Sequence, residues 1–297
     1  MHGAQHLYAE RMDVSLRQLR TLVAVVDAGT FTDAAGELGV SQASVSRSIA
    51  ALESALGARL LQRTTRRVAL TEVGERVTAQ ARRVLEEAGH LTRIVEKRRA
   101  ELRVGYAWAA LGRHTRGVQK RWAAGHPGVP LVLVHVNEPA AGLADGRADV
   151  AVIRRPLDDP RFVTAEVGLE NRYAAVATDH TLARKRTIRL ADLSRYAVAI
   201  DARTGTTTPD LWPPESRPAT IHWTNTIDEW LTQIAANQAV GVTPEATAHQ
   251  NPRPGVAYRM VRDVPPITVS LAWWRDDPPA HVDDLLALVK EVYSGRG

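Results

Sequence analysis

The sequence predicts an α/β protein in two parts, a mostly helical N-terminal third and a larger remainder that alternates strands with helices. Two patterns support this division. Up to about residue 98 the apolar residues recur at helical spacing, whereas from residue 101 onward short β-rich runs alternate with helical stretches. That alternation is typical of an α/β architecture with a largely parallel sheet. With 297 residues, the chain is also longer than one average domain.

Composition narrows the classes of function. The chain carries a formal net charge of +5, and residues 1–99 hold 15 Lys and Arg against 11 Asp and Glu, a net charge of +4. An excess of this kind suits a polyanionic partner such as nucleic acid. The absence of cysteine excludes disulfides, thiolate metal ligands and a cysteine nucleophile. No apolar run could span a bilayer and residues 1–13 lack the core of a signal peptide, so we expect a cytoplasmic protein without a membrane partner.

Two short helices are expected at the start of the first domain, which we delimit as residues 14–70. The first begins after Ser15 as its N-cap, carries an apolar stripe on one face and ends at Gly29. The second takes Thr32 as its cap and ends at a turn formed by Gly39.

A third helix is expected to begin at Ser41 and to end at Gly57. It turns three apolar side chains inward at steps of four and three residues, namely Val45, Ile49 and Leu52. Three helices of this length, with a tight glycine turn between the last two, are typical of a helix-turn-helix. Residues 60–70 then predict two short strands, which together form a wing.

We expect one long linker helix over residues 71–99, because no proline interrupts this stretch. Their apolar residues recur at steps of three and four, which is the spacing of a coiled-coil seam. A lone helix cannot bury such a stripe, so we expect it to pair with a second subunit through Val77, Val84 and Leu91.

The outward face of the third helix suits base recognition. With the apolar stripe inward, five residues lie on the exposed face or at its N-terminal shoulder: Gln42, Ala43, Ser44, Ser46 and Arg47. Gln pairs with adenine and Arg with guanine through two hydrogen bonds each. In the wing, Arg63, Arg66 and Arg67 suit phosphates or the minor groove. The alternative is a solvated helix followed by an arginine-rich loop.

The same region resembles the N-terminal domain of LysR-type transcriptional regulators. The resemblance rests on FTDAA in the second helix, SQASVSRSI in the third, the exit LESALGARLLQR and the linker entry LTEVG. It implies a homodimer or homotetramer that binds double-stranded promoter DNA, with RNA polymerase as a further partner. It also implies that DNA is contacted by Thr32, Gln42, Ser44, Ser46, Arg47 and Arg66. Ala43 departs from the family, where proline is frequent.

Residues 101–297 resemble the effector domain of these regulators, which has two α/β lobes like a periplasmic binding protein. The resemblance rests on LRVGY, ADGRADVAVI, YAAVATDHTLA and QAVGVTPEA. It implies a first lobe of residues 101–177 and 261–297, a second lobe of residues 178–260, and a small-molecule effector in the cleft between them.

Candidate cleft residues in the first lobe follow the ends of its strands. Ala107, Trp108 and Ala109 follow the first strand, where many relatives place a Ser or Thr that caps a helix whose N-terminus receives an acidic ligand. Without that hydroxyl, Trp108 offers a stacking face or occludes the pocket. Arg154 either binds an anionic ligand or pairs on the surface with Asp158 or Asp159.

In the second lobe, the candidate cleft residues are polar. Thr204 and Thr206 lie in a loop, and Thr224, Asn225 and Thr226 follow a strand that ends at Trp223. The last three either hold a ligand or cap the helix that begins at Ile227.

Two other classes of function compete with a ligand-responsive regulator. One is an enzyme, but the chain contains no GxSxG elbow, no phosphate-binding loop and no GxGxxG after a strand. The other is a DNA-binding architectural protein whose second domain binds no ligand. The histidines show no tight ligand spacing apart from His2 and His6, so we expect no metal site and no cofactor.

Overall fold

The computed structural model describes residues 14–63, 68–96 and 101–295 of the chain. The chain falls into two units, Met1–Val95 and Glu96–Gly297, and each is described by itself. Within the described residues, no helix is long and apolar enough to cross a membrane.

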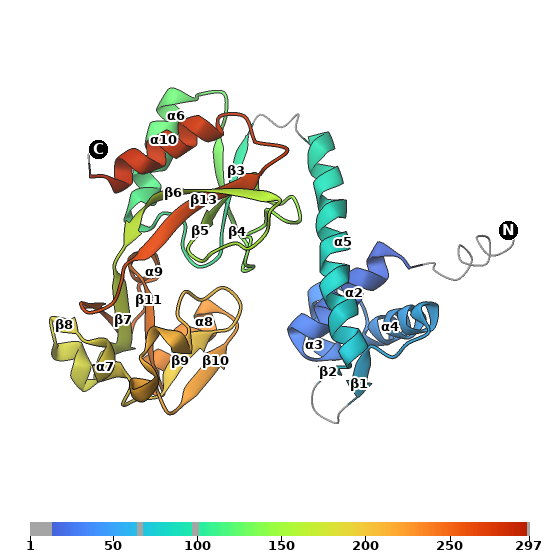
Figure 1. Cartoon of the computed structure of the whole chain (residues 1–297), viewed down its shortest axis with the longest axis horizontal. Coiled ribbons are helices and arrows are strands. Elements are labelled where there is room, and N and C mark those ends of the chain that lie inside the picture. Colours follow the sequence, from blue (N-terminus) through green and yellow to red (C-terminus); the bar gives the residue numbers. More distant parts are fainter. Residues whose placement is uncertain (1–13, 64–67, 97–100, 296–297) are drawn as a thin grey trace, which may run out of the picture. The chain divides into compact units, whose positions relative to one another are not determined.

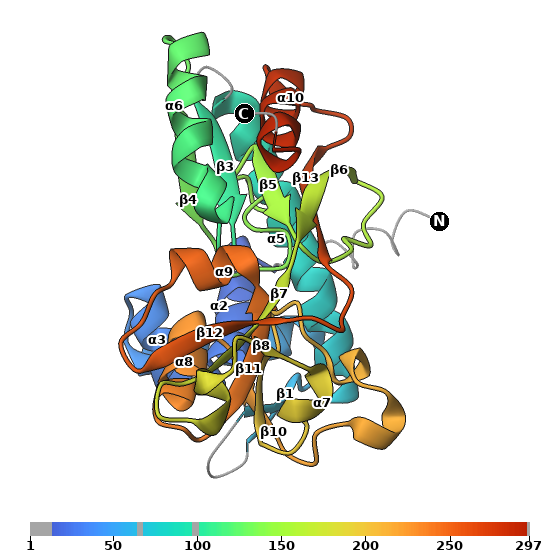
Figure 2. The ribbon, with the colours of Figure 1, turned by 90° about the vertical axis from the view of Figure 1, so that its left-hand side faces the viewer.

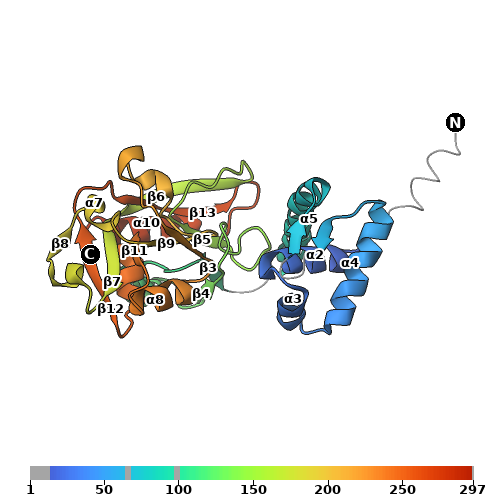
Figure 3. The same ribbon diagram turned by 90° about the horizontal axis from the view of Figure 1, so that it is seen from below.

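The first unit combines helices with a small antiparallel wing (Figures 1 and 3). Its elements are α2 (Leu16–Ala28), α3 (Phe31–Leu38), α4 (Gln42–Leu56), β1 (Leu61–Arg63), β2 (Val68–Leu70) and α5 (Glu72–Glu96). The first helix starts with a capping box, in which Ser15 accepts a hydrogen bond from Gln18 N and donates its own N–H to the Gln18 side chain. The three short helices each end at a glycine in the left-handed region, at φ +74°, +63° and +64°.

The predicted cap of α3 is wrong by two positions. Thr30, not Thr32, has the extended backbone of an N-cap, and its hydroxyl accepts a hydrogen bond from Asp33 N at 3.1 Å. The helix therefore starts at Phe31, whose ring packs against the core of the unit. Thr32 lies inside the first turn and is exposed.

The core of the first unit joins α2 and α4 to one face of α5. Val45, Ile49 and Leu52 are buried as the periodicity predicts, and they meet Leu22 of α2. Ala81 of α5 belongs to the same core and is 2% exposed. The linker helix therefore uses part of its apolar stripe to pack against its own unit.

The first lobe of the second unit contains a five-stranded mixed sheet in the order β4-β3-β5-β13-β6 (Figure 2). The strands are β3 (Leu102–Tyr106), β4 (Leu131–His135), β5 (Val150–Ile153), β6 (Phe162–Glu170) and β13 (Ile267–Trp274). Helices α6 (Thr115–Gly125) and α10 (Val282–Tyr293) pack side by side against it. Trp122 of α6 and Val289 of α10 are almost fully buried in the resulting core.

The second lobe contains a six-stranded mixed sheet in the order β10-β9-β11-β7-β12-β8. The strands are β7 (Arg172–Ala177), β8 (Thr187–Ile188), β9 (Val198–Asp201), β10 (Ile221–Thr224), β11 (Val240–Pro244) and β12 (Val256–Val261). The helices of the second lobe are α7 (Leu190–Leu193), α8 (Ile227–Ala235) and α9 (Glu245–Gln250). In the first lobe, a short 3-10 turn, η1 (Gly112–His114), precedes α6.

Two predictions about this domain need correction. The strand β7 belongs to the second lobe, because it pairs with β11 and β12, so the chain crosses between the lobes at Asn171 and not after residue 177. The sheets are also mixed and not largely parallel. The strands that adjoin the crossings, β7 and β13, run antiparallel to neighbours on both sides.

Candidate functional site

The N-terminal end of α4 presents a polar, exposed face. Ser41 caps the helix by accepting a hydrogen bond from Ser44 N at 3.2 Å, so that Gln42 opens the first turn. Gln42, Ala43 and Arg47 are exposed, while Ser44 and Ser46 are half-buried at its margin. Within the described residues, no hydrogen bond or ion pair occupies the Arg47 side chain. This face is therefore free to bind an external partner.

Contacts at the other end of α4 fix its position against the wing. The Glu53 carboxylate accepts hydrogen bonds from the backbone of Leu60 at 2.7 Å and Leu61 at 3.1 Å. Val68 N in turn donates to Gly29 O, which ties β2 to the end of α2. The acceptor role of Glu53 could not be predicted from the sequence, because it depends on the fold.

The basic residues of the wing are only partly described. Arg63 ends β1 and pairs in register with Val68 of β2, but only its backbone is described. Arg66 and Arg67 lie outside the described residues.

The predicted dimer contacts on α5 divide into two sets. Val77 is half-buried against the core of its own unit. Val84 and Leu91 leave 38% and 66% of their surface exposed, and Val73 leaves 46%. An exposed apolar stripe on a helix is typical of a surface that a partner covers. Only the second set remains available for pairing between subunits.

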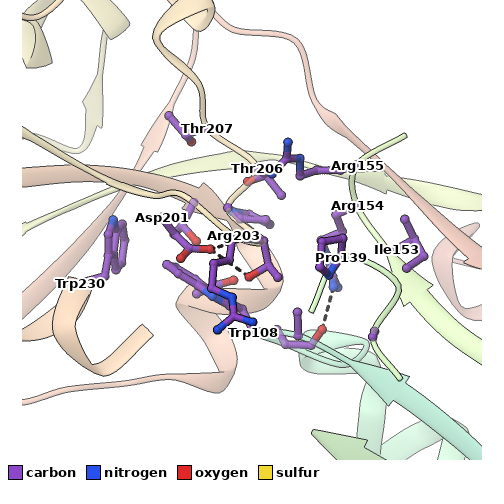
Figure 4. A pocket seen from close by; sticks show the side chains of 18 of the residues that line it. Trp108, Pro139, Ile153, Arg154, Arg155, Asp201, Arg203, Thr206, Thr207 and Trp230 are labelled. Atoms are coloured by element: carbon purple, nitrogen blue, oxygen red, sulfur yellow. Dashed lines mark hydrogen bonds between the residues drawn. The ribbon is translucent and has the colours of Figure 1, made fainter. Parts of the chain in front are cut away.

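A cleft in the second unit is lined by residues of both lobes and has a cavity volume of about 140 Å³. Figure 4 shows Trp108 and Arg154 from the first lobe together with Asp201 and Thr206 from the second. The predicted residues Ala107, Trp108, Ala109, Arg154, Thr204 and Thr206 all line it. Its volume is close to that of an engineered 150 Å³ cavity that holds one benzene molecule.

Arg154 forms a buried ion pair with Glu170, and not the predicted surface pair with Asp158 or Asp159. Its guanidinium donates to the Glu170 carboxylate at 2.9 and 3.0 Å and to the carbonyl oxygens of Ala109 and Ala110 at 2.7 and 2.6 Å. Its side chain is 9% exposed, and that of Glu170 is 6% exposed. The predicted surface partner Asp159 instead binds Arg161 at 2.7 Å.

The Glu170 carboxylate has donors on every side. Besides Arg154, Tyr293 donates its hydroxyl at 2.6 Å and Ala246 its backbone N–H at 3.3 Å. Although burial raises the pKa of Glu170, the charge and hydrogen bonds of Arg154 lower it below its ordinary value. Burial likewise lowers the pKa of Arg154, but Glu170 raises it above its ordinary value. Both groups are therefore charged. Through their hydrogen bonds, the pair joins the loop after β3, which contains Ala109 and Ala110, to α9 and α10.

The loop after β3 is held by the second lobe. The Trp108 ring meets Trp230 edge-on at 5.3 Å between centroids, and Asn251 donates to Trp108 O at 3.3 Å. Gln250 accepts a hydrogen bond from Ala110 N at 3.1 Å. Trp108 thus packs edge-on against Trp230, and both residues line the cleft.

Asn137, which sequence reasoning missed, bridges the two lobes beside the cleft. Its Nδ2 donates to Asn225 O at 2.7 Å, and its Oδ1 accepts from the Thr204 hydroxyl at 2.7 Å. The Asp201 carboxylate accepts from Thr204 N at 2.7 Å. The polar loop after β9 is therefore ordered by its own carboxylate and by the first lobe.

Three predicted cleft residues do not line the cleft. Thr226 caps α8 by accepting a hydrogen bond from Glu229 N at 3.1 Å, as the capping alternative predicted. The buried Thr224 hydroxyl donates to Ile200 O at 3.4 Å. Asn225 N donates to the Glu229 carboxylate at 2.8 Å.

Four buried polar atoms of cleft residues have no hydrogen-bond partner in the described part of the chain. They are Trp108 Nε1, Asp201 Oδ1, Thr206 Oγ1 and Thr243 Oγ1. A buried donor or acceptor left unpaired costs about 1–3 kcal/mol. These unpaired atoms are buried within residues that line the cleft. Asp201 and Thr243 could not be found from the sequence, because their neighbours are distant in the chain.

Comparison with known proteins gives two family matches that together cover most of the chain. Residues 16–75 match the family model "Bacterial regulatory helix-turn-helix protein, lysR family", and residues 96–294 match "LysR substrate binding domain".

Individual relatives agree with these matches. The Hca operon transcriptional activator HcaR of Escherichia coli is 27% identical over 94% of this chain and 98% of its own. The uncharacterised HTH-type regulator YnfL of the same organism is 32% identical over 66% of this chain and 68% of its own. Among solved structures, the LysR family regulator CbnR superposes with a TM-score of 0.51 at 25% identity, over 93% of this chain and all of CbnR. CbnR in complex with its target DNA gives the same TM-score at 24% identity, over 94% of this chain and all of CbnR.

Proposed function

Because the chain belongs to the LysR family of bacterial transcriptional regulators, we propose that it reads promoter DNA with α4 and the wing and responds to a small molecule in the cleft of its second unit. Its relatives are regulators and not enzymes. The observation that carries the DNA half is the exposed polar face of α4, with Gln42 and Arg47 free of partners in the described residues.

On this proposal, α4 lies in the major groove with its N-terminal turn toward the base edges. Gln42 and Arg47 read bases, since both side chains form two hydrogen bonds to one purine. The other residues predicted to contact DNA position the protein on the phosphates or fit the wall of the groove. They are Thr32, Ala43, Ser44, Ser46, Arg63, Arg66 and Arg67. CbnR, whose fold this chain resembles, has been solved in complex with its target DNA.

Footprinting on the DNA that flanks the protein's own gene tests the DNA half. We expect a protected, partly palindromic site, since a two-fold symmetric dimer places two α4 helices in successive major grooves. A footprint that extends evenly along any DNA would reject sequence-specific reading.

The effector half of the proposal rests on the cleft. Its volume suits a molecule of about one six-membered ring, and the polar lining residues Asp201, Thr204 and Thr206 suit a ligand that carries both hydrogen-bond acceptors and donors. Four of the five N–H donors of Arg154 are already in use, so Arg154 is not the anchor for an acidic ligand. Ala107 and Ala109 contribute the apolar wall.

Thermal denaturation against single-ring metabolites tests the effector half. A ligand of the cleft should raise the melting temperature by mass action, and the shift should fall in Thr206→Val, which keeps the volume but removes the hydroxyl. Thr226→Val serves as the control for a threonine that caps α8 outside the cleft. A module that binds no effector would show no shift with any compound.

We further propose that two subunits pair through the exposed stripe of α5, as a dimer or as a tetramer of two such pairs. Val84 and Leu91 leave an apolar surface on the helix that follows the wing. Contact with RNA polymerase follows from the role of a promoter-bound regulator.

A further inference from the structure

Two histidines and an aspartate meet where α6 ends and α10 begins, in the first lobe of the second unit. His126 follows the last residue of α6, and His281 precedes α10, whose first turn contains Asp284. His126 Nε2 and His281 Nδ1 each lie 3.1 Å from the same oxygen, Asp284 Oδ2. The three potential ligand atoms all lie within 4.8 Å of one another. None of these residues lines the effector cleft.

We propose that His126, His281 and Asp284 bind a divalent transition-metal ion, with zinc as the best fit. Imidazole nitrogen and carboxylate oxygen are the ligands that zinc takes in addition to thiolates. Zinc bonds of about 2.0–2.2 Å to nitrogen and oxygen place neighbouring ligands of a tetrahedral site about 3.3 Å apart. The two nitrogen–oxygen distances of 3.1 Å already approach this separation. Three protein ligands leave a fourth position for water.

The His126 ring is held in place before any ion binds. It stacks on Trp122 with 4.0 Å between centroids and an interplanar angle of 12°. Trp122 is 1% exposed, and its indole N–H donates to Val129 O at 2.6 Å, so the ring beneath His126 is fixed in the core of the lobe. A ligand fixed in its binding geometry loses less conformational freedom when it binds.

The second histidine is placed by an unusual backbone. His281 adopts φ +64°, in the left-handed region that a non-glycine residue rarely enters, and its side chain does not cap α10. Its ring meets the His126 ring at 5.0 Å and 73°. Strained backbone of this kind persists where the surrounding structure over-determines it, often at a functional site.

Solvent can reach the cluster. The side chains are 23%, 40% and 53% exposed, in the order His126, His281 and Asp284. An ion at this point would join the C-terminal end of α6 to the N-terminal end of α10 and stabilise the first lobe.

Calorimetric titration of the tag-free, EDTA-treated full chain with Zn²⁺ alone tests the proposal. We expect one ion per chain at this site, with affinity reduced at least about tenfold in His126→Gln, His281→Gln and Asp284→Asn, since even an outer-shell change costs 10- to 100-fold. The matched control is His249→Gln, which removes an exposed histidine of α9 and should bind like the wild type.

Two further measurements distinguish a metal site from a hydrogen-bonded contact between the helices. Zn²⁺ should raise the melting temperature of the wild type but not of the three variants, and Co²⁺ should give visible absorption bands that the variants lose. A wild type that binds no Zn²⁺, or variants that bind it as tightly as the wild type, would overturn the proposal. A third result would also overturn the proposal. If the variants melt at a lower temperature than the wild type in EDTA, and Zn²⁺ does not change the melting temperature of the wild type, the cluster has a purely structural role.

Discussion

Arg154 and Glu170 lie buried beneath the cleft loop, and each depends on the other for compensation of its charge. Glu170 accepts from Arg154, Tyr293 and Ala246, so three separate segments converge on one carboxylate. The pair therefore holds the loop after β3 to α9 and α10. In a periplasmic-binding-protein-like domain, this is the region through which movement of the lobes would be transmitted.

Removal of one partner should destabilise the second unit strongly. Arg154→Met leaves Glu170 buried without a counter-charge, and breaking a buried pair costs about 3–5 kcal/mol. Urea denaturation should show this loss, while the double variant Arg154→Met/Glu170→Gln should lose less than the sum of the single variants. Arg121→Met is the control, because the Arg121–Glu291 pair is exposed and contributes about 1 kcal/mol at most. Equal losses in Arg154→Met and Arg121→Met would contradict this account.

The same pair predicts a pH dependence of stability. Since the pKa of Glu170 is lower in the folded protein than its ordinary 4.5, its contribution is present above about pH 4.5 and is lost as the pH falls through the lowered pKa. Glu170→Gln lacks this contribution. The difference in unfolding free energy between wild type and variant should therefore shrink as the pH falls from 6 toward 3. A difference that stays constant over this range would contradict the assignment.

Single residues of α4 and of the wing should separate base reading from phosphate contact. Gln42→Ala and Arg47→Ala should each weaken binding to the specific site by about 1–3 kcal/mol, with little effect on random DNA. Arg66→Ala should weaken binding evenly on both and reduce the salt dependence. Anisotropy titrations on both DNAs measure this. Equal losses on the two DNAs for Gln42→Ala would remove it from the base-reading residues.

At the scale of elements, α5 has two apolar faces with different tasks. Ala81 is 2% exposed in the core of its own unit, whereas Val84 is 38% exposed. Val84→Asp should lower the mass measured by light scattering and weaken DNA binding, while the first unit keeps its helical circular dichroism. Ala81→Asp is the matched control, which should unfold that unit because it buries an unpaired charge. An unchanged mass in Val84→Asp would exclude this seam.

Some helices and strands could be predicted from the sequence pattern alone, and others could not. The inward stripe of α4 was predictable, because it depends on local periodicity. The strand β6 and the crossing at Asn171 were not, because no glycine or proline marks the step from β6 to β7. Glu170 is the last residue of β6, and this strand was not predicted. The pairing of Arg154 with Glu170 was therefore missed, and Arg154 was paired with Asp158 or Asp159 instead.

At the scale of the whole molecule, family resemblance predicted more than spacing could. The helix-turn-helix and the two-lobed domain were both expected from motifs, and both are confirmed by the matches to the LysR family. The residues that meet from distant segments were not predictable, such as His126 with Asp284 and Asn137 with Thr204. Their proximity is a property of the tertiary fold and leaves no local pattern in the sequence.

The protein joins a DNA-binding unit to an effector-binding domain in one chain. The most direct test is a fluorescence anisotropy titration of the full chain on the footprinted site and on a scrambled site, over a series of salt concentrations. We predict tighter binding to the footprinted site at every salt concentration, with the logarithm of the binding constant falling linearly with the logarithm of salt concentration. Equal affinity for both sites, or affinity that does not change with salt, would contradict the claim that this protein reads DNA through α4 and its basic wing.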